Sequence, residues 1–384
     1  MVITHAYIYP VVGTPIENGY VRFDQSILDL GPMSAYSPQP GEEVYDARDG
    51  WVLPGLIDIH THLGLFGDGV GFEAEDCNEV GDPITPQLRV IDGINPGDAT
   101  FAESLRAGVT AVAVAPGSAN PIGGQVAAIR TFGRRIDDMI IKAPLAIKFA
   151  LGENPKTCYH DRDETPATRM ATAAMIRQAL FEARAYGEKK QAAKENPDLD
   201  PPDFDLKHEA LLPLLRREIQ AHFHAHRLDD IFTAIRIAGE FSLDYVILHG
   251  TEAYLAADIL AAEHARVVTG PNLLDRCKPE LKQMSFSGPG TLQQAGVLCS
   301  ICTDHPETPL KYLPICAAMA RKSGMSHEDA IAAITVNPAK IAGLDDKIGS
   351  LEIGKDADIA VFDGDPLDMA SEVRAVFSLG RKCM

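Results

Sequence analysis

The chain has 384 residues, 46% of them hydrophobic, and a formal net charge of −19 at pH 7. This length fits one large domain of roughly 250 residues together with a smaller one, because a single core rarely grows larger. A strongly acidic surface repels the phosphates of nucleic acids and anionic lipids, which excludes both as expected partners. The sequence has no apolar run of about 18 residues, and this argues against a membrane span.

The N-terminus and the cysteines bear on the compartment in which the chain works. The opening MVITHAYIYPVVG lacks a basic start followed by a long apolar run, so we expect no secretory signal. The seven cysteines are scattered along the chain, as is typical of proteins in a reducing compartment. We therefore expect a cytoplasmic protein.

Both ends of the chain carry short runs of alternating polar and apolar residues, over 1–50 and 348–384. Pro, Gly, Asn and Asp separate these runs, and the pattern predicts small antiparallel strands. We expect the two ends to form one composite β-domain, a small β-sandwich. Its predicted bounds are 1–51 and 346–384, with 52–345 forming the other domain.

The middle of the chain alternates apolar strand-like runs with helical segments, which is typical of βαβ units around a parallel sheet. The number of strand-like runs approaches eight, with the weakest in GGQVAAIRTFG, and favours a closed barrel over an open sheet. The predicted fold class is therefore α/β, a (β/α)8 TIM barrel, with an exposed Pro- and Asp-rich loop at 195–206. The expected helices cover 98–107, 166–193, 228–241, 251–263, 311–322 and 327–337.

The first barrel strand ends in the run Asp58-Ile59-His60-Thr61-His62. Alternate residues of a strand share a face, so Asp58, His60 and His62 should point into the barrel together. Two neutral imidazoles two residues apart can reach one metal ion from a single strand. This spacing predicts that His60 and His62 are metal ligands.

A second histidine cluster lies in the run His222-Phe223-His224-Ala225-His226. Its three histidines share one strand face. We expect His224 to be a metal ligand, His226 to lie further out near the substrate, and His222 to lie deeper in the core. The acidic pair Asp229-Asp230 suits the start of the helix that follows.

Two further residues end strand-like runs. His249 follows the apolar run Tyr245-Val246-Ile247-Leu248, and Asp304 follows Ser300-Ile301-Cys302-Thr303. The carboxyl ends of barrel strands form the catalytic face, so both side chains should enter the same site. A carboxylate there can bind metal and can accept a proton from an attacking water molecule.

Together these residues resemble the amidohydrolase superfamily, in particular its imidazolonepropionase-related members. The matching motifs are GLIDIHTHLG, FHAHRLDDI, VILHGTE and SICTDHP, and the late stretch NPAKIAGLDDKIGSLEIGKDADIAVFDGDP resembles the return into a β-domain. The resemblance covers nearly the whole chain. It implies a barrel that binds one or two divalent metal ions, commonly zinc, and in many members a homo-oligomer. The implied ligands are His60, His62, His224, His249 and Asp304.

Members of this superfamily with two metals use a bridging group, and the sequence offers two candidates. In LAIKFALG, Lys148 should point into the barrel between Ala146 and Ala150. A bare ammonium beside metal ions would be costly, and carboxylation would turn it into an anionic ligand. Glu153, just past the strand end, resembles the bridging glutamate of other members. Lys148 is the favoured candidate, and Glu153 stays open.

The predicted function is metal-dependent hydrolysis of a carbon–nitrogen bond in a small molecule, either a non-peptide amide or a dipeptide-like amide. Metal-activated water attacks, Asp304 acts as general base and then acid, and His226 steadies the oxyanion. Asn154, Lys156 and Arg227 are candidate substrate contacts. The alternatives are a deaminase with one metal ion and, with less support, a non-catalytic hydantoinase-like scaffold.

Overall fold

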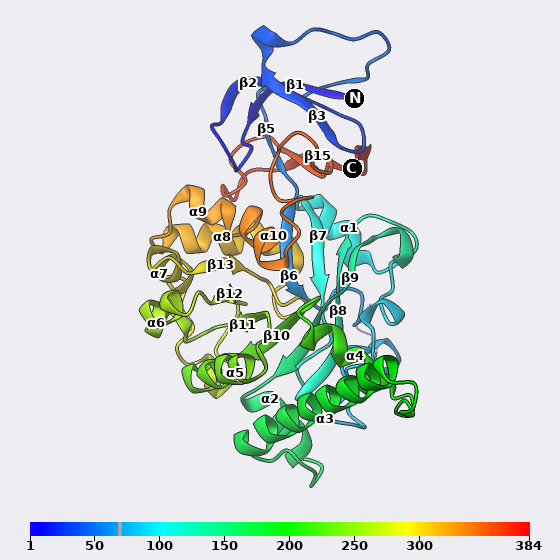
Figure 1. The fold of residues 1–384 in the computed structure, drawn as a ribbon. Coiled ribbons are helices and arrows are strands. Elements are labelled where there is room, and N and C mark those ends of the chain that lie inside the picture. The colour runs from blue at the N-terminus through cyan, green and yellow to red at the C-terminus, as the bar shows by residue number, and fades with distance from the viewer. Residues whose placement is uncertain (68–70) are drawn as a thin grey trace.

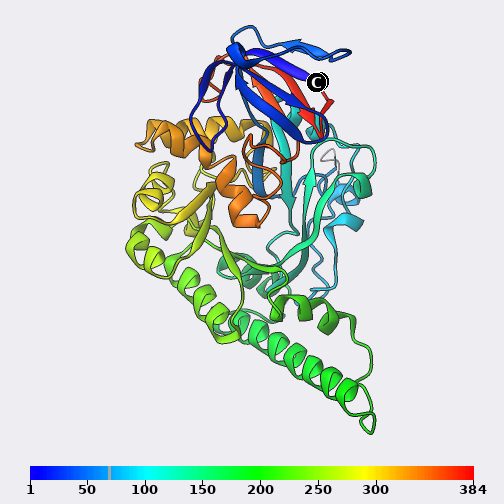
Figure 2. The ribbon, with the colours of Figure 1, turned by 45° about the horizontal axis from the view of Figure 1, so that its top comes forward.

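The computed structural model describes residues 1–67 and 71–384. Two eight-stranded sheets organise the chain, one nearly closed into a barrel and one built from the two ends of the chain. The sheet of the two ends lies on one side of the barrel, and the longest helix extends along the opposite side (Figures 1 and 2). No helix in the described residues is long and apolar enough to cross a membrane.

The barrel sheet confirms the predicted TIM-barrel class. Seven of its strands run in one direction, whereas β8 is antiparallel to both of its neighbours. Residues 115–121, between β7 and β8, are too few for the crossover of a dozen or more residues that a parallel connection needs. The strands, in order around the barrel, are β6 (Leu56–Thr61), β7 (Val109–Val114), β8 (Ile122–Arg130), β9 (Ile140–Ala150), β10 (Gln220–Ala225), β11 (Tyr245–His249), β12 (Arg266–Thr269) and β13 (Leu298–Ile301).

The helices cover the outside of the barrel, and the largest apolar core lies between helices and strands β9 to β13. The predicted helix at 228–241 is present with the same bounds, and 196–205 forms an exposed link, as expected. The predicted helix at 327–337 is divided into two. The helices are α1 (Ala99–Arg106), α2 (Glu153–His160), α3 (Arg169–Glu195), α4 (Leu206–Leu215), α5 (Leu228–Phe241), α6 (Ala257–Ala262), α7 (Gly288–Gln294), α8 (Leu313–Lys322), α9 (His327–Ala332) and α10 (Val336–Ala342).

Side-chain and backbone hydrogen bonds connect the two end strands of the barrel sheet, β6 and β13. The carboxylate of the fully buried Asp58 accepts hydrogen bonds from the backbone N–H and the hydroxyl of Thr303, both at 2.7 Å. The backbone N–H of His62 donates to the carbonyl oxygen of His305 at 2.9 Å. These bonds hold the carboxyl ends of the first and last strands together.

The sheet of the two ends joins strands from both termini around a small apolar core. β5 pairs with β14 and leads directly into β6, so the N-terminal half of this sheet is continuous with the barrel. The exact division into domains at 51/52 and 345/346 stays a prediction. The strands are β1 (Val2–Ile8), β2 (Ile16–Phe23), β3 (Ile27–Pro32), β4 (Val44–Asp46), β5 (Trp51–Pro54), β14 (Ile359–Phe362), β15 (Val373–Ser378) and β16 (Arg381–Lys382).

A buried ion pair connects the barrel to this second sheet. Arg130, the last residue of β8, places its Nε 3.2 Å from an oxygen of Asp358, and it also contacts Asp356. Asp358 is almost fully buried and accepts further hydrogen bonds from the Ser378 hydroxyl at 2.9 Å and the Leu379 N–H at 3.0 Å. Burial raises the pKa of the Asp358 carboxyl group, so its charged form depends on these partners.

We predict that Arg130→Met destabilises the fold by about 3–5 kcal/mol, because it leaves the Asp358 carboxylate buried without its cation. The measurement is the shift in the urea unfolding midpoint. The matched control is Arg135→Met, whose ion pair with Asp137 is exposed and should contribute little. Equal midpoints for the two variants would contradict the structural role of the buried pair.

Candidate functional site

The carboxyl ends of the parallel strands bring together most of the residues that the sequence predicts as ligands. Because β6, β10, β11 and β13 run in the same direction, their ends open onto one face of the barrel. The residues collected there are His60, His62, His224, His226, His249 and Asp304. They form two neighbouring groups.

The first group consists of His60, His62 and Asp304. One oxygen of Asp304 lies 3.1 Å from Nε2 of His60 and 3.3 Å from Nε2 of His62. Two ligands of one tetrahedral zinc ion, each bonded at about 2.0–2.1 Å, are separated by roughly 3.4 Å. The spacing of these three side chains therefore suits a shared divalent ion.

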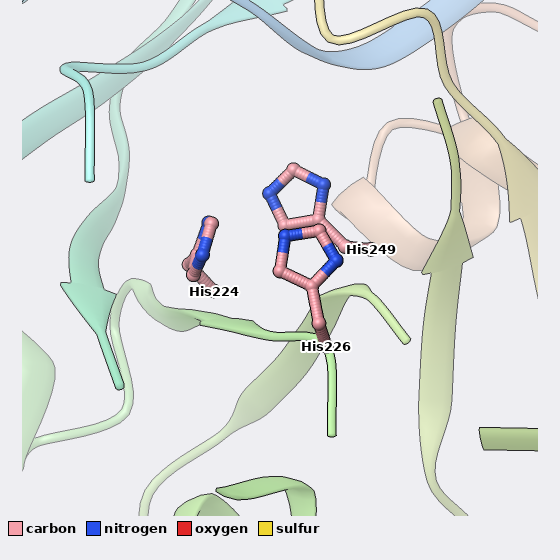
Figure 3. A group of neighbouring side chains, drawn as sticks. All are labelled: His224, His226 and His249. Atoms are coloured by element: carbon pink, nitrogen blue, oxygen red, sulfur yellow. The ribbon is translucent and has the colours of Figure 1, made fainter. Parts of the chain in front are cut away.

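The second group consists of His224, His226 and His249, all three buried. Figure 3 shows the rings of His226 and His249 lying nearly face to face, with His224 beside them. The centroids of His226 and His249 are 4.5 Å apart at an interplanar angle of 18°, and those of His224 and His249 are 4.4 Å apart. One ring nitrogen of each residue lies within 4.8 Å of the other two.

Backbone carbonyl groups orient two of these imidazoles. Nδ1 of His62 lies 2.8 Å from the carbonyl oxygen of Ala115, and Nδ1 of His249 lies 2.8 Å from that of Gly270. A carbonyl oxygen can only accept, so each Nδ1 carries a proton, and in the neutral ring Nε2 presents the lone pair. Metal-binding histidines are commonly oriented by such a bond on their second nitrogen.

Several buried polar atoms in the two groups lack a hydrogen-bond partner among the described residues. These atoms are both ring nitrogens of His60, Nε2 of His224, Nε2 of His249 and Oδ1 of Asp304. Burial lowers the pKa of His60, His224 and His249 well below its usual range, so these imidazoles are neutral. Buried polar atoms are normally satisfied, and a divalent ion would satisfy these.

The backbone at two site residues adopts a conformation that L-residues rarely take. His249 has φ of 70° and Asp304 has φ of 52°. A left-handed backbone at a residue other than glycine costs free energy, and such residues cluster at functional sites. The backbone is therefore strained at the two residues that place the His249 and Asp304 side chains in the site.

Lys148 lies on β9 with its whole side chain buried, as predicted for an inward-facing residue. Its Nζ donates to the carbonyl oxygen of Pro116 at 3.3 Å, and burial lowers its pKa to about 8. In the strand pairing, Lys148 lies beside His222 of β10, two residues before His224. Its buried side chain therefore lies on the strand next to the one that carries His224.

The predicted substrate contacts divide between two cavities. Asn154 lines a cavity of about 270 Å³ that also contains His62, His224, His226 and Asp304. This cavity opens directly onto both histidine groups. Of the three predicted contacts, Asn154 is the one that the structure brings to them.

Lys156 and Arg227 line a neighbouring cavity of about 330 Å³, together with Glu153. Arg227 is paired there with the exposed Asp229 at 2.9 Å. Glu153 begins α2, and its backbone N–H donates to the carboxylate of Glu280 at 3.1 Å. The structure therefore does not bring Glu153 into either histidine group.

Glu280 is a site residue that the sequence did not predict. Its side chain is 1% exposed, and its Oε1 lies 3.7 Å from Nε2 of His226 and 3.8 Å from Nε2 of His224. The ammonium of Lys278 lies 3.1 Å from the same oxygen and donates to Oδ1 of Asn154 at 3.0 Å. Both residues come from the long link after β12, in a stretch with no motif that predicts its position.

Two hydroxyl groups that orient the second group were also missed. The Ser118 hydroxyl lies 2.8 Å from Nδ1 of His224, and the Thr251 hydroxyl lies 2.7 Å from Nδ1 of His226. Ser118 comes from the short link between β7 and β8, and Thr251 follows the end of β11. Only the folded arrangement of the links reveals these contacts.

Comparisons with known proteins agree with this geometry. A crystal structure of an amidohydrolase from Thermotoga maritima MSB8 is 41% identical, with a TM-score of 0.96, and the match covers 100% of this chain and 99% of that one. An imidazolonepropionase from Rhizorhabdus wittichii is 28% identical over 380 residues, covering 91% of this chain and 88% of the relative. Amidohydrolase tasK from Hapsidospora irregularis is 28% identical over 353 residues, which are 85% of this chain but only 36% of tasK.

The family model described as the amidohydrolase family matches residues 51–383, which include both histidine groups and Asp304. This match covers most of the chain, and the fold and the structural relative at 41% identity are consistent with it. The chain belongs to the amidohydrolase family.

Proposed function

We propose that the protein hydrolyses a carbon–nitrogen bond in a small cyclic or dipeptide-like amide. The observation that carries this proposal is the set of buried histidine nitrogens, without hydrogen-bond partners among the described residues, in two groups of which one contains Asp304. The names of the relatives, amidohydrolase and imidazolonepropionase, support the same class of reaction. The exact amide stays open between the cyclic and the dipeptide-like class.

The residues of the first group fit a divalent ion, for which His60, His62 and Asp304 offer two nitrogens and one oxygen. A bound divalent ion supplies positive charge that polarises a substrate oxygen and lowers the pKa of water toward about 7. Zinc suits this set of ligands, although manganese and iron accept the same ligand types. We propose zinc as the native ion.

Asp304 is the proposed proton carrier. Its carboxylate lies beside both histidines of the first group and lines the cavity in which a substrate would sit. In this position it receives the proton of the attacking water and returns it to the leaving nitrogen. The ordered bonds of Asp58 to Thr303 fix the neighbouring backbone and so hold Asp304 in place.

The cavity favours a small, partly apolar substrate. Phe66, Leu274 and Leu281 line it, while Asn154 and Lys278 place polar groups on its wall. Apolar lining with a few oriented polar groups is typical of small-molecule sites. We propose that the amide nitrogen of Asn154 and the ammonium of Lys278 donate hydrogen bonds to oxygen atoms of the substrate.

Replacement of Asp304 by Asn should lower kcat on any amide that the wild-type protein hydrolyses by about 10²- to 10⁴-fold, because Asn cannot carry the proton. The measurement is steady-state turnover after a screen of cyclic amides and dipeptides. Asp92→Asn, at an exposed carboxylate paired with Arg89, is the matched control and should keep wild-type turnover. A variant at Asp304 with unchanged turnover and bound metal would exclude Asp304 as the proton carrier.

Lys148 is the proposed bridging group, in its carboxylated form, because its side chain is fully buried on the strand next to the one that carries His224. Lys148→Met should therefore lower the amount of metal bound per chain, whereas Glu153→Gln should not, since Glu153 lies in the neighbouring cavity. The measurement is elemental analysis of protein purified with bicarbonate and without chelator. Loss of metal in the Glu153 variant alone would reverse this assignment, and one ion per chain in all forms would favour the deaminase alternative.

A further inference from the structure

The link between β12 and α7, residues 270–287, lines two cavities. Leu274 lines the proposed substrate cavity, which also contains Asp304. Met284 and Phe286 line a second cavity of about 470 Å³. Leu274 lines this second cavity as well, so the two cavities are neighbours that meet at this residue. The proposed reaction uses only the first of them.

The second cavity collects apolar side chains that the folded chain leaves partly uncovered. Leu274, Met284 and Phe286 are half-buried, and none of them belongs to the apolar cores of the described residues. Leu273, next to Leu274 in the link, packs against one of these cores instead. Apolar side chains that line a concave surface without packing against a core are typical of a small-molecule site.

The charged group that lines the second cavity is engaged by the link itself. Arg276 is the one charged residue among the described residues on its wall, where Asn272 and Ser285 add neutral polar groups. Nε of Arg276 donates to the carbonyl oxygen of Lys282, and Nη2 donates to that of Met284, each at 3.2 Å. A guanidinium free of such bonds favours an anion, but two of the three nitrogens hold the link together here. The cavity therefore favours an apolar group over a charged one.

Two hydrogen bonds from outside the link hold this wall in place. The Thr308 hydroxyl donates to the carbonyl oxygen of Leu273 at 3.2 Å, and the Tyr254 hydroxyl donates to that of Gln283 at 3.1 Å. Thr308 follows shortly after Asp304, so the wall is connected to the segment that carries the proposed proton carrier. A cavity whose wall is already ordered needs little further ordering when a ligand binds, and this favours affinity.

We propose that the second cavity is a subsite for an apolar substituent of the substrate, which reaches it past Leu274 while the amide lies at the histidine groups. The inference rests on the proposed function and names its substrate class more closely: an amide, cyclic or dipeptide-like, that carries an aliphatic or aromatic side chain. The subsite depends neither on the number of bound ions nor on the bridging group. Leu274, Met284 and Phe286 are its specificity-determining residues.

The experiment compares kcat/KM within two series of amides, dipeptides and five-membered cyclic amides, in which one substituent grows from methyl to isobutyl to benzyl. In the wild-type protein, kcat/KM in at least one series should rise about 10- to 100-fold from methyl to benzyl, because the larger group buries more apolar surface. A benzyl-to-methyl ratio of kcat/KM near one in both series would overturn the inference and leave the proposed function standing.

Two variants locate the effect in the second cavity. Phe286→Ser removes an apolar wall and should lower the benzyl-to-methyl ratio about 5- to 10-fold. Leu274→Trp should lower the ratio as well, since a larger side chain obstructs the passage between the cavities. Phe204→Ser is the matched control and should keep the wild-type ratio, because Phe204 is 75% exposed in the link before α4. A wild-type ratio in both cavity variants would contradict the subsite. If Phe286→Ser fails to fold, as judged by circular dichroism, Met284→Ser takes its place.

A binding measurement decides the case in which the wild-type protein hydrolyses none of these amides, so that the proposed function fails. Isothermal titration calorimetry on the full-length protein then gives the dissociation constants of the same two series. A benzyl amide that binds about 10-fold or more tightly than its methyl counterpart, with this difference lost in Phe286→Ser, would support the subsite without the reaction. Equal affinity for the two amides, or no binding of either, would overturn the subsite together with the function.

Discussion

The site depends on the burial of histidine nitrogens that the fold brings together without hydrogen-bond partners among the described residues. His60, His224 and His249 are buried and neutral, and nitrogens of these rings have no hydrogen-bond partner in the part of the chain that the structure describes. Such an arrangement is unfavourable by itself, because each buried acceptor has given up water without gaining a donor. A divalent cation is a partner that would satisfy these atoms at once.

The surrounding barrel holds these side chains in place. Asp58 joins the first and last strands through two hydrogen bonds to Thr303, directly before the strained backbone of Asp304. Strained residues persist only where the surrounding structure determines their conformation. The hydrogen bonds that close the barrel therefore also fix the position of the Asp304 carboxylate.

The sequence predicted the parts of the site that follow from strand periodicity. His60 lies on β6 with His62 directly after it, and His224 lies on β10 with His226 directly after it, and each pair follows the period of two with which side chains in a strand alternate. The apolar run before His249 and the run before Asp304 likewise predicted strand ends at a common face. The TIM-barrel class followed from the same alternation of strands and helices, and the structure confirms it.

The features that could not be predicted lie in the links between strands. Links have no repeating pattern that relates the place of a residue in the sequence to its position in the structure. The antiparallel direction of β8 depends on the shortness of the link at 115–121. The sequence gives the length of this segment, but of all the predicted strands β8 had the weakest strand pattern. Glu280 and Lys278 reach the site from a long link whose path depends on tertiary packing. Their residue types are common on surfaces, so only the observed burial of Glu280 reveals a special role.

Strands and links therefore contribute different residues to the site. The strands, or the residues directly after them, carry the proposed ligands, and hydrogen-bonded ladders hold such side chains at distances that change little. The link after β12 carries Glu280 and Lys278, whereas Asn154 lies in α2. Because Lys278 contacts both Glu280 and Asn154, it connects the link after β12 to α2 at the wall of the cavity. We expect that a change of substrate preference can arise in this link without any change in the strands that carry the proposed metal ligands.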